Sequence, residues 1–108
     1  MGLKIRIKKH GRTPVLLLGG KAVGEYVRRI SEKISDLAEG DSQTIVIDLS
    51  ALDCADSNGL GAFVYSWKLV RSKDKKLLFL DPLGLVKNLF EESGLDKVFT
   101  IIASLDGV

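Results

Sequence analysis

The residues of this sequence that are best placed for chemistry lie between a buried strand and a helix. The segment from Ile45 to Phe63 reads IVIDLSALDCADSNGLGAF, which predicts a strand that leads through a loop into a helix with a small, polar first turn. Ser57 lies at or just before the predicted start of that helix. Free backbone N–H groups and the helix dipole favour an anion there, so the position suits a bound phosphate or a phosphate on Ser57 itself. The simpler interpretation is that Asp56 or Ser57 caps the helix.

Two glycines in the same segment raise the alternative of a dinucleotide-binding loop. Gly59 and Gly61 open a helix that follows a strand, as the glycines of that motif do. The third glycine is missing, because Val64 occupies its position, and a long loop stands where the motif needs a tight turn. The segment GGKAVGE at 19–25 has its glycines and lysine in the wrong order for a Walker phosphate loop. Binding of a nucleotide or small anion therefore rests on the helix start at Ser57 alone.

The composition excludes several other kinds of site. With Cys54 as the single cysteine and His10 as the single histidine, the chain offers no zinc ligand set, no internal disulfide and no Ser-His-Asp triad. We therefore expect no metal, no cofactor and no enzymatic activity. The net charge of +2 argues against nucleic-acid binding. The basic residues at the start of the chain are expected on a solvated strand face: Lys4, Arg6 and Lys8.

Hydropathy also bears on where the protein acts. No apolar run approaches the roughly 20 residues that cross a bilayer. The basic residues at the start are interleaved with apolar ones, whereas a signal peptide has an unbroken apolar stretch. We expect a cytoplasmic protein that does not insert into a membrane.

Hydrophobic periodicity predicts one domain over residues 1–108, with eight elements in the order β-β-α-β-α-β-α-β. An α/β fold follows, with a small mixed sheet on which the helices pack, because parallel-type buried strands alternate with helices. The strands are expected at about 3–9, 14–18, 44–49, 77–81 and 98–102, and the helices at about 23–39, 57–72 and 83–93.

Taken together, the motif and the order of elements resemble the STAS domain of bacterial anti-sigma factor antagonists. The resemblance is carried by DLSALDCADSNGLGAFV, by the strands TIVIDLS and LLFLD, and by ESGLDKVFTI. It covers nearly the whole chain. The hexamer DSNGLG after a buried strand is fairly specific to that family.

The resemblance implies a partner-switching protein. Ser57 would be phosphorylated by an anti-sigma factor that is also a serine kinase, and Asp56, Asn58, Gly59, Leu60 and Gly61 would form the surroundings of the phosphate and the partner-binding surface. The unphosphorylated protein would bind the kinase and release the sigma factor, whereas the phosphorylated protein would let the kinase go.

Three positions depart from the family pattern. Asn58 stands where the family often has serine or threonine, and Val23 stands where many members have an aspartate near the phosphorylation site. The chain ends at Val108, so the usual last helix is expected to be short or absent, which would expose a face and favour a homodimer. Val23 and the chain end favour an alternative function, that of an unphosphorylated accessory module docking on a larger complex such as a transporter.

Overall fold

A β-hairpin opens the chain, as the alternation of apolar and basic residues predicts. In the computed structural model, which describes residues 2–108, β1 (Leu3–His10) pairs antiparallel with β2 (Thr13–Ala22). Gly11 adopts a φ of 63° in the tight turn between them, a conformation that favours glycine. Leu3 is buried, whereas Lys4, Arg6 and Lys8 are all exposed on the opposite face of β1. The hairpin therefore presents its basic residues to solvent.

The other strands run parallel to β2 and are joined by helices. The sheet order is β1-β2-β3-β4-β5, with β2 to β5 parallel neighbours. This mixed sheet with intervening helices confirms the predicted α/β class and order of elements. The remaining elements are β3 (Thr44–Ala55), β4 (Lys76–Leu80), β5 (Thr100–Ile102), α1 (Arg28–Ala38), α2 (Ser57–Ser72), α3 (Gly84–Ser93) and the 3-10 turns η1 (Gly24–Val27) and η2 (Leu95–Lys97).

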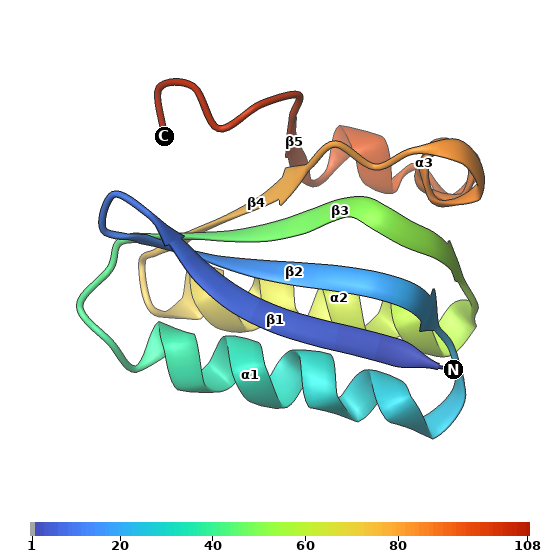
Figure 1. Ribbon diagram of the computed structural model, residues 1–108, viewed down its shortest axis with the longest axis horizontal. Helices are drawn as coiled ribbons and strands as arrows, with labels where there is room; N and C mark the ends of the chain where they lie inside the picture. The colour runs from blue at the N-terminus through green and yellow to red at the C-terminus, as the bar shows by residue number, and fades with distance from the viewer. Residues whose placement is uncertain (1) are drawn as a thin grey trace.

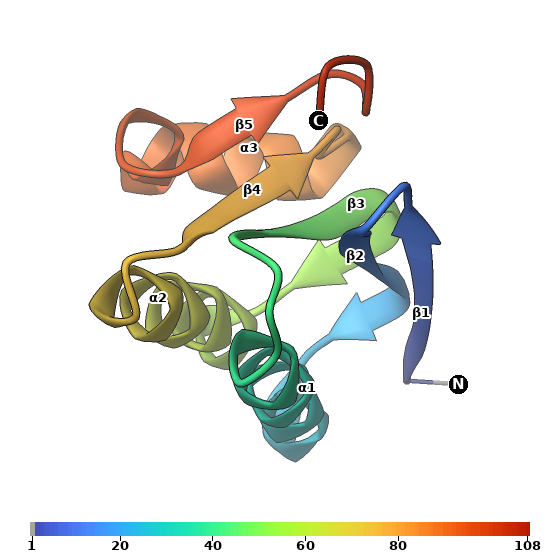
Figure 2. The same ribbon diagram turned by 90° about the vertical axis from the view of Figure 1, so that its left-hand side faces the viewer.

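The main core lies between the sheet and the helices. Helices α1 and α2 lie side by side along one face of the sheet, and α3 lies beside the end formed by β4 and β5 (Figures 1 and 2). Phe79 of β4 stacks on Phe99 with ring centroids 4.1 Å apart, and edge contacts join both rings to Phe90. Further fully buried side chains of this core come from β2, β3, α1, α2 and α3, among them Leu16, Leu18, Ile45, Ile47, Leu49, Ile30, Ile34, Phe63, Val70 and Val86.

A smaller cluster covers the second face of the sheet. Val15, Val46 and Leu80 are buried there. The partly buried side chains that cover them come from the strands and from the last residues of the chain, namely Leu17, Leu78, Ile102, Leu105 and Val108. Residues 103–108 form turns and no helix. Side chains from an irregular segment thus help to cover this face.

The strand bounds differ from the predicted ones wherever a distant segment completes the pairing. Strand β3 continues beyond residue 49 to Ala55, because its later residues pair with Gly19 to Ala22 of a longer β2. The register between these strands shifts at two places, so the added pairing is irregular and carries no clear alternation in the sequence. Strand β4 spans 76–80 rather than 77–81, because Asp81 adopts a φ of 53°.

Three further expected elements begin later than predicted. The helix expected from residue 23 becomes the turn η1 followed by α1 from Arg28, since Gly24 has a φ of 64°. The last strand begins at Thr100 rather than at residue 98, because η2 and the helical backbone of Val98 precede it. The third helix occupies 84–93 where 83–93 was expected.

Candidate functional site

The site around Ser57 is built on Asp56, which joins two loops at the carboxyl end of the parallel strands. Asp56 is extended, with φ −103° and ψ −170°, and it is the N-cap of α2. Its Oδ1 accepts a hydrogen bond from the Gly59 N–H at 3.0 Å, as a capping residue does. Its Oδ2 accepts from the Gly24 N–H, also at 3.0 Å. One carboxylate therefore ties the start of α2 to the loop that follows β2.

These hydrogen bonds favour the ionised form of the Asp56 carboxyl. The Gly59 N–H and then the Gly24 N–H hold its pKa below the ordinary value of 3.8, because both donate to the charged form, and desolvation opposes them only in part. The negative charge also lies at the positive end of the helix dipole. The anion site that the sequence predicts at this helix start is therefore filled by the protein's own carboxylate.

Gly59 lets the first turn of α2 approach the end of β2. A Cβ atom at this position would lie 2.2 Å from the Ala22 carbonyl oxygen and 3.1 Å from the Ala55 Cβ. The Asp56 N–H donates to the same Ala22 carbonyl at 3.2 Å. The close approach of the α2 backbone to the β2 backbone therefore explains why residue 59 is a glycine. A dinucleotide-binding loop, the alternative explanation that the sequence allowed, is not needed to account for it.

The predicted site residues lie together in the first turns of α2, with different exposures. Ser57 is the first residue of the helix, so the capping role falls to Asp56. Ser57, Asn58 and Gly61 are exposed, Leu60 is half-buried and Gly59 is buried. Apart from the adjoining residues and backbone of α2 itself, no heavy atom would lie within 4 Å of a Cβ at Gly61, so its neighbourhood is open. The arrangement presents Ser57 between exposed neighbours, where another protein can reach it.

Sequence reasoning missed two residues that belong to this region. The Gly24 N–H donates a hydrogen bond to Asp56. The sequence signal that could have indicated this residue is a glycine two positions after the end of β2 at Ala22. Tyr65 is 59% exposed and follows Ser57 and Gly61 at intervals of four, which places the three on one face of α2. Val23 is half-buried beside Gly24, so the position that is often acidic in the family is neutral here and adjoins the Asp56 cap.

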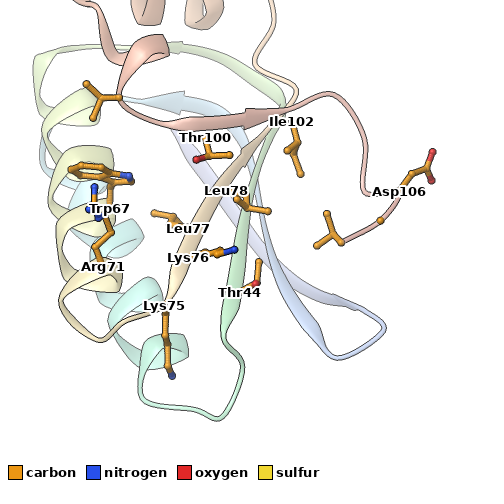
Figure 3. A pocket seen from close by; sticks show the side chains of 13 residues that line it. Thr44, Trp67, Arg71, Lys75, Lys76, Leu77, Leu78, Thr100, Ile102 and Asp106 are labelled. Carbon is orange, nitrogen blue, oxygen red and sulfur yellow. The ribbon is translucent and has the colours of Figure 1, made fainter.

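A groove lies at the other end of α2. About 630 Å³ in volume, it is bounded by α2, β4, β5 and residues 106–108 (Figure 3). The Arg71 guanidinium lies 4.7 Å from the centre of the Trp67 ring, and Trp67 also packs against Phe99. No residue from Asp56 to Gly61 lines this groove.

Residues 2–108 contain neither a cluster of metal ligands nor a membrane-spanning helix. No three His, Cys, Asp or Glu side chains gather there as the ligands of a metal ion would. Among the helices of this part of the chain, none has both the length and the apolar character needed to cross a membrane.

Comparison with known proteins agrees with the fold. Residues 4–108 match the family model of the STAS domain. The chain belongs to the STAS domain family, and its fold is the one that the resemblance implied.

Individual relatives are similar over nearly the whole chain. The anti-sigma-B factor antagonist of Staphylococcus aureus is 27% identical over 101 residues, which cover 94% of each protein. An anti-sigma factor antagonist from Mycobacterium paratuberculosis superposes with a TM-score of 0.85 at 20% identity, covering 97% of this chain and 89% of that one. The phosphorylated form of SpoIIAA, a Bacillus cell fate determinant, gives a TM-score of 0.72 at 23% identity, covering 94% and 93%. The protein thus resembles anti-sigma factor antagonists.

Proposed function

We propose that this protein is an anti-sigma factor antagonist that is switched by phosphorylation of Ser57. Its partner would be an anti-sigma factor with serine kinase activity in the cytoplasm, and binding of the unphosphorylated protein would free a sigma factor for transcription. Curated relatives that carry the name anti-sigma-B factor antagonist support this assignment, and so does the phosphorylated form in which SpoIIAA has been solved.

The observation that carries the proposal is the exposed Ser57 in the first turn of α2. The helix is 16 residues long and its start is held by Asp56, so the hydroxyl is presented on a rigid element. Rigid presentation favours recognition, because little conformational entropy is lost when a partner binds. In this proposal the protein is the substrate of the kinase and performs no catalysis itself.

The proposed switch follows from the charge beside Ser57. A phosphate adds about −1.5 to −2 charge at neutral pH. The Gly59 N–H that would stabilise it already donates to the ionised Asp56, and the Leu60 N–H donates to the Asp56 carbonyl at 3.0 Å. Repulsion from Asp56 therefore directs the phosphate toward solvent and toward any bound partner. A partner whose surface fits the neutral Ser57 hydroxyl would then dissociate, because the phosphate repels nearby negative charge and loses its hydration in the interface.

Phosphorylation can be tested directly with the anti-sigma factor kinase of the same organism. We expect ATP and the kinase to add one phosphate, which mass spectrometry assigns to Ser57, and we expect Ser57→Ala to accept none. A phosphate on another serine, or none on a folded protein that binds the kinase, would contradict the proposal.

Binding tests the charge mechanism separately. Ser57→Asp should weaken binding to the kinase at least tenfold in calorimetric titration, because a carboxylate beside Asp56 imitates part of the phosphate charge. Ser72→Asp is the matched control, since it makes the same change on the same helix about 22 Å away. Equal affinities of the two variants would exclude the charge mechanism.

Val23 favours a second candidate function, a STAS module that docks without being phosphorylated. This neutral residue lies next to Gly24 and therefore beside the Asp56 cap, in the position that the family resemblance makes acidic. The exposed face of Ser57, Gly61 and Tyr65 would then bind a larger complex such as a transporter. Recovery of such a complex by a tagged protein that no kinase phosphorylates would favour this candidate.

A further inference from the structure

Strand β1 leaves one of its two edges unpaired. It is eight residues long and forms the first strand of the sheet, with β2 as its neighbour on one side. In Figure 2, β1 stands at the margin of the molecule, and no helix or strand covers its outer side. An unpaired edge of this length offers backbone N–H and C=O groups to another strand.

The direction of these groups can be read from one hydrogen bond. The carbonyl of Leu3 accepts from Arg29 Nη1 of α1 at 3.2 Å, so it points away from β2. Backbone groups of successive residues in an antiparallel strand face opposite sides. Those of Ile5 and Ile7 therefore point outward as well, where a further strand would pair with them.

The edge is also strongly basic. The first 24 residues hold six of the sixteen Lys and Arg residues of the chain and none of its fourteen Asp and Glu residues. Lys4, Arg6 and Lys8 are exposed on one face of β1, at every second position. The ion pair found within residues 2–108 joins Lys73 to Glu39, far from this strand in the sequence. The positive charge of β1 is thus not balanced within the hairpin.

This charge selects which strand can pair with β1. A second β1 would place cations opposite cations, which opposes pairing between copies. A strand with acidic residues at alternate positions would place a carboxylate opposite or diagonal to each cation. On the other face of β1, Ile7 is 48% exposed. An apolar residue between the acidic residues of the added strand would pack against it.

We propose that the outer edge of β1 binds an acidic segment of a partner protein, which adds to the sheet as a sixth strand. The segment alternates acidic with apolar residues, so that its acids meet Lys4, Arg6 and Lys8. This strand addition goes beyond the proposed function, because it uses the first strand of the sheet and not the Ser57 surface of α2. It requires no phosphorylation of Ser57.

The test uses synthetic peptides as probes and the whole protein. A nine-residue peptide that alternates glutamate and valine should bind in a fluorescence anisotropy titration, and NMR should show protection of β1 amides. A peptide of the same composition with its glutamates grouped at one end should bind at least tenfold more weakly. The alternating peptide with N-methyl groups along one edge should also bind at least tenfold more weakly, because it keeps the charge and loses strand pairing.

Charge reversal on the protein provides the matched pair of variants. Arg6→Glu should weaken binding of the alternating peptide at least tenfold, whereas Lys33→Glu, the same change of sign on the exposed side of α1, should leave it within twofold. Circular dichroism of each variant verifies that the fold is kept. Equal binding of the three peptides, no binding of any of them, or binding to phosphatidylserine vesicles without binding of the alternating peptide would each overturn the proposal.

Discussion

Gly59 and Gly61 lie two residues apart in the first turns of α2, but their surroundings differ completely. A Cβ at Gly59 would lie 2.2 Å from the Ala22 carbonyl, while a Cβ at Gly61 would meet nothing within 4 Å. From the sequence, both residues were expected in the partner-binding surface. The contact with Ala22 separates them, and it depends on a strand 37 residues earlier in the chain, so no local pattern reveals it.

Paired substitutions should show this difference in stability. Gly59→Ala should lower the free energy of unfolding by about 3 kcal/mol, because the new methyl group overlaps backbone that cannot easily move. Gly61→Ala should raise it by up to about 1 kcal/mol, because alanine favours a helix and has room here. Urea denaturation measures both values. A loss at Gly61 as large as that at Gly59 would contradict the structure.

Asp56 should make stability depend on pH in a defined interval. Its pKa in the folded protein is lower than in the unfolded chain, so the folded state binds fewer protons and stability falls as the pH drops through the range below about 4. Asp56→Asn should reduce the melting temperature at pH 7, because the amide cannot accept from both Gly59 and Gly24. The difference between the two proteins should shrink toward pH 2 in calorimetric melts. If the difference in melting temperature stayed constant from pH 7 to pH 2, the charge of Asp56 would not contribute to the stability of the fold.

At the scale of elements, the sequence predicts best what depends on local pattern. The α2 and α3 helices were expected within one residue of their observed bounds, because apolar spacing and end signals coincide. Gly94 ends α3 with a φ of 78°, as Ser93-Gly94-Leu95 predicts. Elements whose ends depend on distant partners were less predictable.

Strand β3 illustrates that limit. Residues 44–49 are nearly all apolar and were expected as a strand, whereas 50–55 contain polar residues that read as a loop. They are nevertheless paired with β2, across two shifts of register. The same long-range pairing brings Gly24 to Asp56, which explains why the local sequence pattern did not reveal Gly24 as a partner of Asp56.

At the scale of the whole molecule, the two faces of the sheet are covered by different means. Three helices pack against one core, while Leu105 and Val108 help to cover the second face from a segment of turns. The last residues of the chain are therefore part of the packed structure.

Truncating Leu105 measures how much this cover contributes. Leu105→Ala should lower the free energy of unfolding by about 1–2 kcal/mol, less than a fully buried leucine would, because Leu105 is partly buried. The same change at Leu85, which is 62% exposed, should alter it by less than about 0.5 kcal/mol. Equal effects in chemical denaturation would mean that residues 103–108 do not contribute to the second face.

The contacts of Trp67 have a practical consequence for spectroscopy. Trp67 is the single tryptophan, and it lies against Arg71 and Phe99 about 15 Å along α2 from Ser57. Its emission will follow global unfolding and any opening beside β5, and events at Ser57 will leave it unchanged. Cys54, the single cysteine, lies three residues before Ser57 and offers one thiol for a dye. The two ends of α2 can therefore be observed separately in one molecule.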